Sequence, residues 1–427
     1  MPAASRRHAD FVCALVLVGL MAGVAGLAST ALLRFVEHLT YHYRFGTLLG
    51  GVTSSSPIRR ALGPMVGGAL AGLGWWALRS TSRVPSLTEA ISSRDRLPLL
   101  ALSTDAALQL IVVGSGASLG REGAPRQLAA ALADTATRWL HRLSVRDREI
   151  LLACAAGAGL GAVYAVPVGG ALFSARVLLK TWHPRALGAA LITSSVAVAV
   201  ASAITHDRPI LDWPSPRLSY LLTAHAVLLA PITLAVGAGF NRLMAAARRA
   251  RVQRLAALVP AIAAAGLLIG ICSHWWPDLP GNGRSILTVS LDSGMTLVTA
   301  GVLLVLKPVL TAIFLRAGAN GGMLTPSLAT GAAAGSLLVL TTNTVLGTQI
   351  SVPAISLAGA VGVLAVTQRA PLWAAVFVWE LALPPLWLLL VFLVAAFGAH
   401  GLRALLERRR AVPTAAAARR SGVGSLG

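Results

Sequence analysis

Two short glycine- and proline-rich stretches hold the residues whose types and spacing could do chemistry in this chain. The first, LGREGAPRQL at 119–128, places Arg121 and Glu122 side by side between glycines, just before Pro125. The second, GGMLTP, ends at Pro326. Glycine lets the backbone turn, and proline is tolerated in the first turn of a helix, where its missing N–H costs nothing. Both stretches therefore predict the start of a helix.

A helix that starts inside an apolar medium attracts anions, because its first amide groups lack partners and carry roughly half a positive charge. A small inorganic anion is therefore the predicted substrate. Glu122 is the predicted gate, since a carboxylate at a helix start can occupy the anion's own place until it moves or takes a proton. The alternative is that Glu122 only pairs with Arg121 in a surface loop. Arg121 is either such a structural partner or a source of positive potential along the anion path.

The composition requires these stretches to lie in a membrane protein. The chain has 427 residues, of which 56% are hydrophobic and 12% charged, whereas soluble domains are about 25% charged. Such a chain is predicted to be an all-α polytopic protein, because an open sheet cannot satisfy its backbone in lipid. Apolar runs of spanning length, roughly 20 residues, lie near 11–35, 61–78, 148–175, 186–204, 217–237, 255–275, 293–315 and 383–399.

The net charge of +21 is explained by its placement beside these apolar runs. Arginines cluster near Arg6, between Arg242 and Arg254, and between Arg403 and Arg420. Arginine-rich loops next to spans remain in the cytoplasm, so no nucleic-acid partner is required. We expect a multi-pass protein of the cell membrane with both termini in the cytoplasm.

Matched spacings indicate two structurally related halves. YAVPVGGALFSAR and QRAPLWAAVFVWE each contain a proline, a phenylalanine six positions later and an ionisable residue three further on. Pro167 follows Pro125 by 42 residues, and Pro371 follows Pro326 by 45. Repeats with broken apolar segments are typical of transporters that hold substrate between their halves. The predicted organisation is a cytoplasmic N-terminus at 1–9, membrane halves at 10–205 and 217–406, a linker at 206–216, and a cytoplasmic tail at 407–427.

These motifs resemble those of the CLC family of chloride channels and chloride/proton antiporters, of the prokaryotic type without C-terminal regulatory domains. GREGAP is similar to the family's GREGP signature, with the proline one place late, and AGANGGMLTP is similar to its GxFxP segment. Further similar stretches are GLGAVYAVPVGGALF, GAGFNR and QRAPLWAAVFVWE. The resemblance implies two inverted halves, a homodimer in which each subunit has its own anion pathway, and no cofactor.

The resemblance also assigns roles to single residues. Glu122 takes the position of the gating glutamate, next to Arg121 and Gly123. TSRVP at 81–85 stands where the family has GSGIP, which makes Ser82 the candidate anion-coordinating hydroxyl. In the second segment, Met323 and Leu324 would contribute only backbone amides to the anion.

Three departures from the family bear on mechanism. Arg176 and Val177 stand where coupled transporters have a proton glutamate. A coordinating tyrosine is expected near Arg403, but no tyrosine follows Tyr220. Asp105 replaces a lysine. The sequence favours a gated passive or weakly coupled pathway for chloride-like anions; proton-coupled antiport and fluoride export within the same family are the alternatives.

An enzyme is the alternative from another class, and the sequence offers it no catalytic residues. His38 and His42 have the only metal-like spacing, but they are better explained by an interface with water, so no metal site is predicted. The chain also lacks a GxxxxGK[ST] motif for nucleotide phosphates, so ATP-driven transport is not supported.

Overall fold

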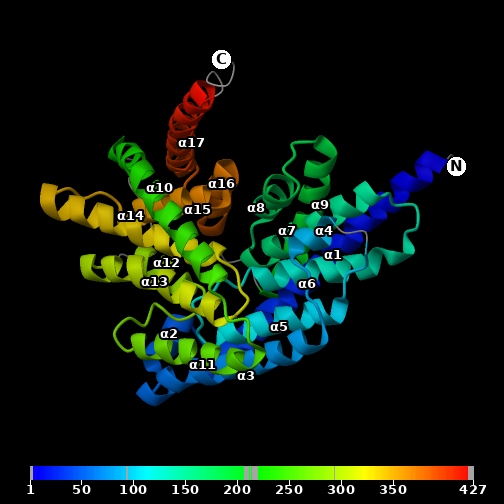
Figure 1. Ribbon diagram of the computed structural model, residues 1–427, viewed down its shortest axis with the longest axis horizontal. Coiled ribbons are helices and arrows are strands. Elements are labelled where there is room, and N and C mark those ends of the chain that lie inside the picture. Colours follow the sequence, from blue (N-terminus) through cyan, green and yellow to red (C-terminus); the bar gives the residue numbers. More distant parts are fainter. Residues whose placement is uncertain are drawn as a thin grey trace.

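The computed structural model describes residues 3–92, 95–205, 211, 213, 220–292 and 294–421, and these residues fold into helices joined by turns and loops (Figure 1). The first set of helices is α1 (Ala3–Tyr41), α2 (Leu48–Ser54), α3 (Pro57–Thr81), α4 (Leu87–Ser92), α5 (Leu99–Gly114), α6 (Gly123–Ala136), α7 (Val145–Tyr164), α8 (Pro167–Leu172) and α9 (Pro184–Thr205). The second set is α10 (Tyr220–Arg249), α11 (Leu255–Cys272), α12 (Arg284–Leu291), α13 (Leu297–Ala317), α14 (Leu324–Leu346), α15 (Val352–Gln368), α16 (Pro371–Ala382) and α17 (Trp387–Ser421).

Eight of the described helices are long and apolar enough to cross a membrane. Seven of the eight predicted apolar runs coincide with these spans. The exception is 148–175, which forms α7 and α8 rather than one helix, because Ala165 is left-handed (φ 54°) and Pro167 then begins α8. The eighth structural span, Leu324–Leu346, was not predicted because glycine, serine and threonine interrupt its apolar character.

The two halves repeat the same packing. In the first half α5 packs on α6, α6 on α7, and α7 on both α8 and α9. In the second half α13 packs on α14, α14 on α15, and α15 on both α16 and α17. Likewise, α7 and α9 pack on α1 in the first half, and α15 and α17 pack on α10 in the second half. In Figure 1, helices α5 to α9 lie on the right and α12 to α17 on the left. The predicted pair of related halves is therefore confirmed.

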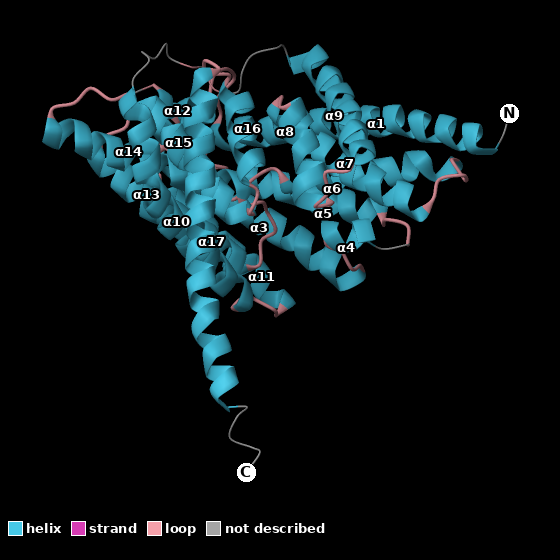
Figure 2. Ribbon diagram, turned by 90° about the horizontal axis from the view of Figure 1, so that it is seen from above, coloured by secondary structure: helices cyan, strands magenta, loops and turns pink. Residues whose placement is uncertain are grey.

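The repeated proline motifs adopt the same backbone geometry. Ala165 (φ 54°, ψ 41°) matches Arg369 (φ 55°, ψ 32°), and the residue after each is extended before a proline starts the next helix. These helices, α8 and α16, lie side by side in both views (Figures 1 and 2). The carboxylate of Glu380 on α16 accepts hydrogen bonds from the backbone N–H groups of Val168 (3.0 Å) and Gly169 (2.6 Å). Glu380 therefore caps α8 across the boundary between the halves.

Close helix crossings depend on glycine. A Cβ on Gly331 or Gly335 of α14 would collide with the backbone of α15, and one on Gly359 of α15 would collide with α14. Backbones approach this closely only where side chains are absent, which is common between membrane helices. These crossings hold α14, and with it the glycine-rich start of α14, in a fixed position.

The predicted domain boundary falls on a segment about which little is described. Of the expected linker 206–216, only 211 and 213 belong to the described residues. In the predicted tail, the helix α17 continues to Ser421 and extends away from the other helices (Figure 2). Residues 422–427 and the first two residues lie outside the described part of the chain.

Candidate functional site

The two predicted helix starts meet at the centre of the molecule. The stretch from Ser115 to Glu122 is not helical, and Gly116 adopts a positive φ of 115° there. The N–H of Gly120 donates to the carbonyl of Gly322 (2.7 Å), and the N–H of Gly322 donates to that of Gly120 (2.8 Å). This pair of hydrogen bonds joins the halves three residues before α6 begins at Gly123 and two residues before α14 begins at Leu324.

The carboxylate of Glu122 lies on the start of α14. It accepts a hydrogen bond from the backbone N–H of Leu324 (2.6 Å) and another from the hydroxyl of Thr325 (2.9 Å). The side chain of Glu122 is fully buried, and Glu122 is also the N-cap residue of α6. A carboxylate in this position takes the place that the free amides and partial positive charge of a helix start offer to an anion. It is not paired with Arg121 in a surface loop.

Glycine provides the space that Glu122 needs. A Cβ on Gly322 or on Gly120 would collide with the Glu122 carboxylate. The two glycines that join the halves thus also let the backbone approach the acid closely. This explains the glycine at position 120 of the first predicted stretch and the glycine at position 322 of the second.

Two cavities are lined by the residues on either side of this acid in the chain. One, of about 490 Å³, is lined by Arg121 together with Arg34, Glu37, Arg44 and Arg284, and we call it the arginine cavity. The other, of about 590 Å³, is lined by Gly123 and Ser82, among others, and we call it the Gly123 cavity. The two neighbours of Glu122 in the chain therefore line different cavities, Arg121 the first and Gly123 the second.

Arg121 lines the arginine cavity, and no carboxylate in the described part of the chain forms an ion pair with it. Its guanidinium lies 5.0 Å from the centre of the Tyr164 ring, and one Nη donates weakly to the carbonyl of Val163 (3.4 Å). Its Nε is buried and has no hydrogen-bond partner. This geometry fits a source of positive potential beside the acid better than a structural ion pair.

The other predicted anion-binding residues are placed differently. Leu324 contributes its backbone amide at the site, but Met323 is the N-cap of α14 and no hydrogen bond of its amide to Glu122 is found. Gly123 starts α6 and lines the Gly123 cavity. Ser82 is the C-cap of α3, exposed, and lines the same cavity; its N–H donates to the carbonyl of Leu78 (2.8 Å).

Two hydroxyl groups at the site were not predicted. The Thr325 hydroxyl holds Glu122, and the Tyr164 hydroxyl is 2.9 Å from that of Thr325. Their positions in the sequence are the one feature that could have indicated these two residues. Thr325 lies inside the second helix-start motif, and Tyr164 ends the apolar helix just before the first proline repeat. A tyrosine hydroxyl therefore lies near the acid, although it comes from α7 and not from the last helix.

Asp105 has a structural explanation that the sequence did not provide. Its buried carboxylate accepts hydrogen bonds from the indole N–H of Trp75 (2.8 Å), the amide of Gln109 (2.8 Å) and the amide of Asn320 (2.7 Å). Arg251 in turn donates to the Oδ1 of Asn320 (2.6 Å). The acid is thus the centre of a polar network in the wall of the Gly123 cavity, joining both halves.

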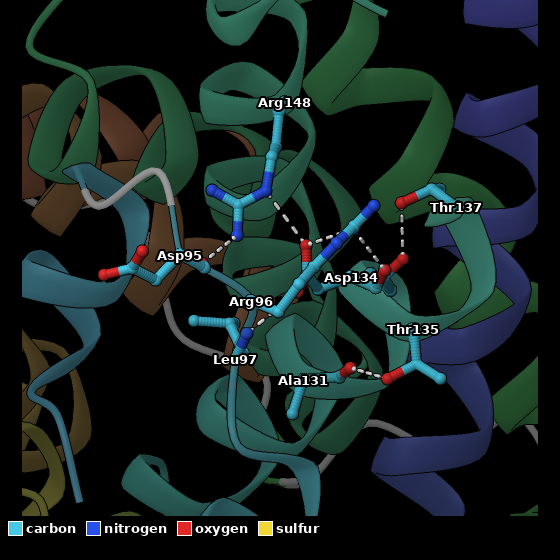
Figure 3. A network of polar contacts seen from close by, with 9 residues as sticks. Asp95, Arg96, Leu97, Ala131, Asp134, Thr135, Thr137 and Arg148 are labelled. Carbon is cyan, nitrogen blue, oxygen red and sulfur yellow. Dashed lines mark hydrogen bonds and ion pairs between the residues drawn. The ribbon is translucent and has the colours of Figure 1, made fainter. Parts of the chain in front are cut away.

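The far end of α6 is anchored by a second buried acid, Asp134 (Figure 3). One oxygen of its carboxylate is 3.1 Å from an Nη of Arg96 and 3.0 Å from the Nε of Arg148. The other oxygen accepts the N–H of Leu97 (3.0 Å). These contacts fix the helix whose first turn follows Glu122.

Other residues singled out by the sequence lie away from this centre. Arg176, at the position of the family's proton glutamate, stacks over the Trp182 ring at 4.2 Å. Within the described residues, no group of three or more His, Cys, Asp or Glu side chains has the arrangement of a metal site, and His38 forms an edge-on contact with Tyr43 instead.

Comparisons with known proteins agree with this architecture. A family model described as voltage gated chloride channel matches residues 67–403. The voltage-gated ClC-type chloride channel ClcB of Escherichia coli O81 (strain ED1a) is 31% identical over 379 residues, which cover 86% of this chain and 89% of that protein. ClcB of Escherichia coli (strain SMS-3-5 / SECEC) is 32% identical over 378 residues, covering 85% and 88%.

Two solved structures share the fold at low sequence identity. A slow cyanobacterial Cl⁻/H⁺ antiporter superposes with a TM-score of 0.76 at 21% identity, covering 94% of this chain and 98% of that one. A CLC-type fluoride/proton antiporter gives a TM-score of 0.72 at 18% identity, covering 91% and 94%. The predicted all-helical membrane fold with two inverted halves is thus confirmed.

Proposed function

Because the chain belongs to the CLC family of voltage gated chloride channels, whose members transport anions and are not enzymes, we propose that it carries chloride-like anions along the path that Glu122 closes. The observation on which this proposal depends is the Glu122 carboxylate, held by the amide of Leu324 and the hydroxyl of Thr325. A carboxylate that occupies the helix start excludes an anion from it. When the carboxylate leaves or takes a proton, the start of α14 becomes free to bind a substrate anion.

The path runs from the arginine cavity, past Glu122, to the Gly123 cavity. Arg121 raises the local anion concentration on the first side through its positive potential. On the other side, Gly123 and Ser82 line the exit, and the amide of Leu324 binds the anion at the narrowest point. Met323 shapes the start of α14 and is not needed as a ligand.

We propose that movement is passive or only weakly coupled to protons. Arg176 replaces the acid that the family resemblance leads one to expect for inner proton transfer, and its guanidinium is stacked on Trp182. Asp105 does not substitute for that acid, because its carboxylate is held by three hydrogen-bond donors in a structural network. The alternative is a proton-coupled antiporter, in which water supplies the inner proton route; the cyanobacterial and fluoride antiporters with this fold favour that alternative.

Liposomes containing the purified protein test the mechanism. Chloride efflux and external pH are followed in the same cuvette for the native chain, Glu122→Gln and the surface control Glu149→Gln. We expect chloride efflux without proton movement in the native chain. The efflux rate should change in Glu122→Gln and should keep its native value in the control Glu149→Gln. Uphill proton movement driven by a chloride gradient would overturn passive transport, and unchanged efflux in Glu122→Gln would overturn the gate.

The orientation in the cell membrane and the homodimer are part of the same proposal. We place both termini and the arginine-rich segment 242–254 in the cytoplasm, which puts the end of α1 and the arginine cavity on the outer side. Accessibility of tags at each terminus in intact and permeabilised cells tests the orientation. The mass of the detergent-purified particle tests the homodimer, which is the assembly that the family resemblance implies.

A further inference from the structure

The arginine cavity contains a carboxylate that the proposed transport mechanism does not use. Four arginines line this cavity, namely Arg34, Arg44, Arg121 and Arg284. Among the described lining residues, Glu37 is the one acidic side chain. A cavity built this way attracts anions, so an acid inside it must compete with them.

Glu37 is held by one neutral donor and not by a closed ion pair. The Tyr43 hydroxyl donates to its Oε2 at 3.2 Å. Among the described residues, no nitrogen of Lys, Arg or His lies within 4.0 Å of its carboxylate oxygens. Arg121, Arg284 and Arg34 nevertheless act on it electrostatically across the cavity. The half-buried carboxylate thus lies in the positive potential of these arginines and forms no ion pair with any of them.

Arg121 shows that the cavity is prepared to bind a further acceptor. Its side chain is more than nine-tenths buried, and its buried Nε has no hydrogen-bond partner. An unsatisfied buried donor of a charged group is costly unless a ligand or water meets it. The same residue precedes Glu122 in the chain, so an anion bound here would be next to the gate.

We propose that Glu37 is a second titratable carboxylate of the anion path, one that competes with the entering anion for the arginines of this cavity and makes anion entry from this side depend on pH. The inference rests on the proposed function, since it concerns the same path. While Glu37 is ionised, it neutralises part of the positive potential. When it is protonated, the cavity gains one unit of positive charge and binds chloride more tightly.

The expected change in chloride affinity follows from the electrostatic effect of one unit charge across a water-filled cavity. At a separation of roughly 8 Å in a medium between water and protein, one unit charge changes the affinity for a monovalent anion about threefold to fivefold. The effect is on apparent affinity for chloride, because Glu37 lies at the entrance and not at the closed point beside Leu324. The maximal rate is therefore expected to change little.

The effect of Glu37 on the pH dependence must be distinguished from the effects of other titratable groups near this entrance. His38 lines the same cavity and contacts the Tyr43 ring, with 4.5 Å between ring centres. Asp278, in the loop before α12, is buried, and burial raises the pKa of its carboxyl to about 6 against the opposing effect of Lys307. Each of the two groups therefore supplies a matched variant.

The experiment uses the full chain with Glu122→Gln, which removes the titration of the gate. Chloride uptake into liposomes is measured against chloride concentration, with the pH on the arginine-cavity side varied from about 7.5 to 4.5. We expect the apparent KM to fall about threefold to fivefold on acidification, and this fall to disappear in Glu37→Gln but to persist in Glu37→Asp, Asp278→Asn and His38→Gln.

Each other outcome has a defined meaning. A pH-dependent KM that persists in Glu37→Gln, or one that is lost in His38→Gln instead, overturns the assignment. If Glu37→Gln does not fold, Tyr43→Phe replaces it: loss of the donor favours the protonated acid, so the KM transition should move to higher pH, and an unmoved transition overturns the proposal. Failure of the proposed function appears separately, as absence of chloride uptake by the Glu122→Gln protein at every pH.

Discussion

At the scale of single residues, the closed state that we propose for the path depends on two donors from the opposite half of the chain. The amide of Leu324 and the hydroxyl of Thr325 both point at the Glu122 carboxylate. The Thr325 hydroxyl also pairs with that of Tyr164. A hydroxyl that donates to the acid and accepts from tyrosine strengthens the closed state, because hydrogen bonds to charged groups are stronger than those between neutral groups.

Thr325→Val removes one of these donors without changing the shape of the side chain. A hydrogen bond to a charged group contributes roughly 1.5–3 kcal/mol, so the closed state should weaken and chloride efflux at neutral pH should rise about tenfold. Thr325→Ser should keep the native rate. Thr330→Val is the control, since its buried hydroxyl bonds only to the carbonyl of Pro326 on the same helix. Equal rates in Thr325→Val and the native protein would contradict this role.

At the scale of elements, α6 positions the gate because both of its ends are fixed. Its start is tied to the other half through the hydrogen bonds between Gly120 and Gly322. Its end is tied through Asp134 to Arg96, Leu97 and Arg148 (Figure 3). A helix held at both ends keeps its first turn, and the acid before it, in register with α14.

Asp134→Asn tests the anchor at the end of α6. The substitution removes the buried negative charge that faces the guanidinium of Arg148, while Arg96 is largely exposed and loses little. We expect a loss of about 2 kcal/mol in stability, measured as a lower midpoint of thermal unfolding in detergent. Arg96→Gln should lower the midpoint much less. Similar midpoints for Asp134→Asn and the native protein would show that the end of α6 is held by packing alone.

At the scale of the whole molecule, the predictable parts of the architecture are those set by the backbone preferences of glycine and proline. Glycines and prolines at matched spacings located both helix starts and indicated two related halves, because these residues restrict or free the backbone locally. The break between α7 and α8 was not predicted, because the left-handed residue at this turn is Ala165 and not a glycine. The span α14 was missed because its small residues serve a close crossing with α15 rather than lipid.

The site was predictable only in part for a similar reason. Glu122 and Leu324 were found because they belong to motifs, whereas the Tyr164 hydroxyl and the partners of Asp105 come from residues far apart in the chain. Trp75, Gln109 and Asn320 meet around Asp105 only after both halves have packed. Contacts of this kind leave no local pattern, so the reason for an acid at position 105 appears only in the folded chain.

Glu380 offers a test of how the two halves hold each other. Its carboxylate accepts the N–H groups of Val168 and Gly169 at the start of α8, and Trp373 on the same helix donates to the carbonyl of Gly169 (2.9 Å). Glu380→Ala removes the cap and its favourable charge at a helix start, which together contribute about 1–2 kcal/mol. Glu380→Gln removes the charge but keeps one acceptor, so its loss should be about half as large.

The measurement is the midpoint of thermal unfolding in detergent for the native chain and both variants, with chloride efflux recorded for the same preparations. We expect the midpoints to fall in the order native, Gln, Ala, and efflux per folded molecule to change less than twofold, because Glu380 contacts neither cavity wall. Equal midpoints in all three proteins would mean that the halves are held by apolar packing and by the Gly120–Gly322 pair without help from this cap. A large change in efflux with unchanged midpoints would instead connect the boundary between α8 and α16 to the gate.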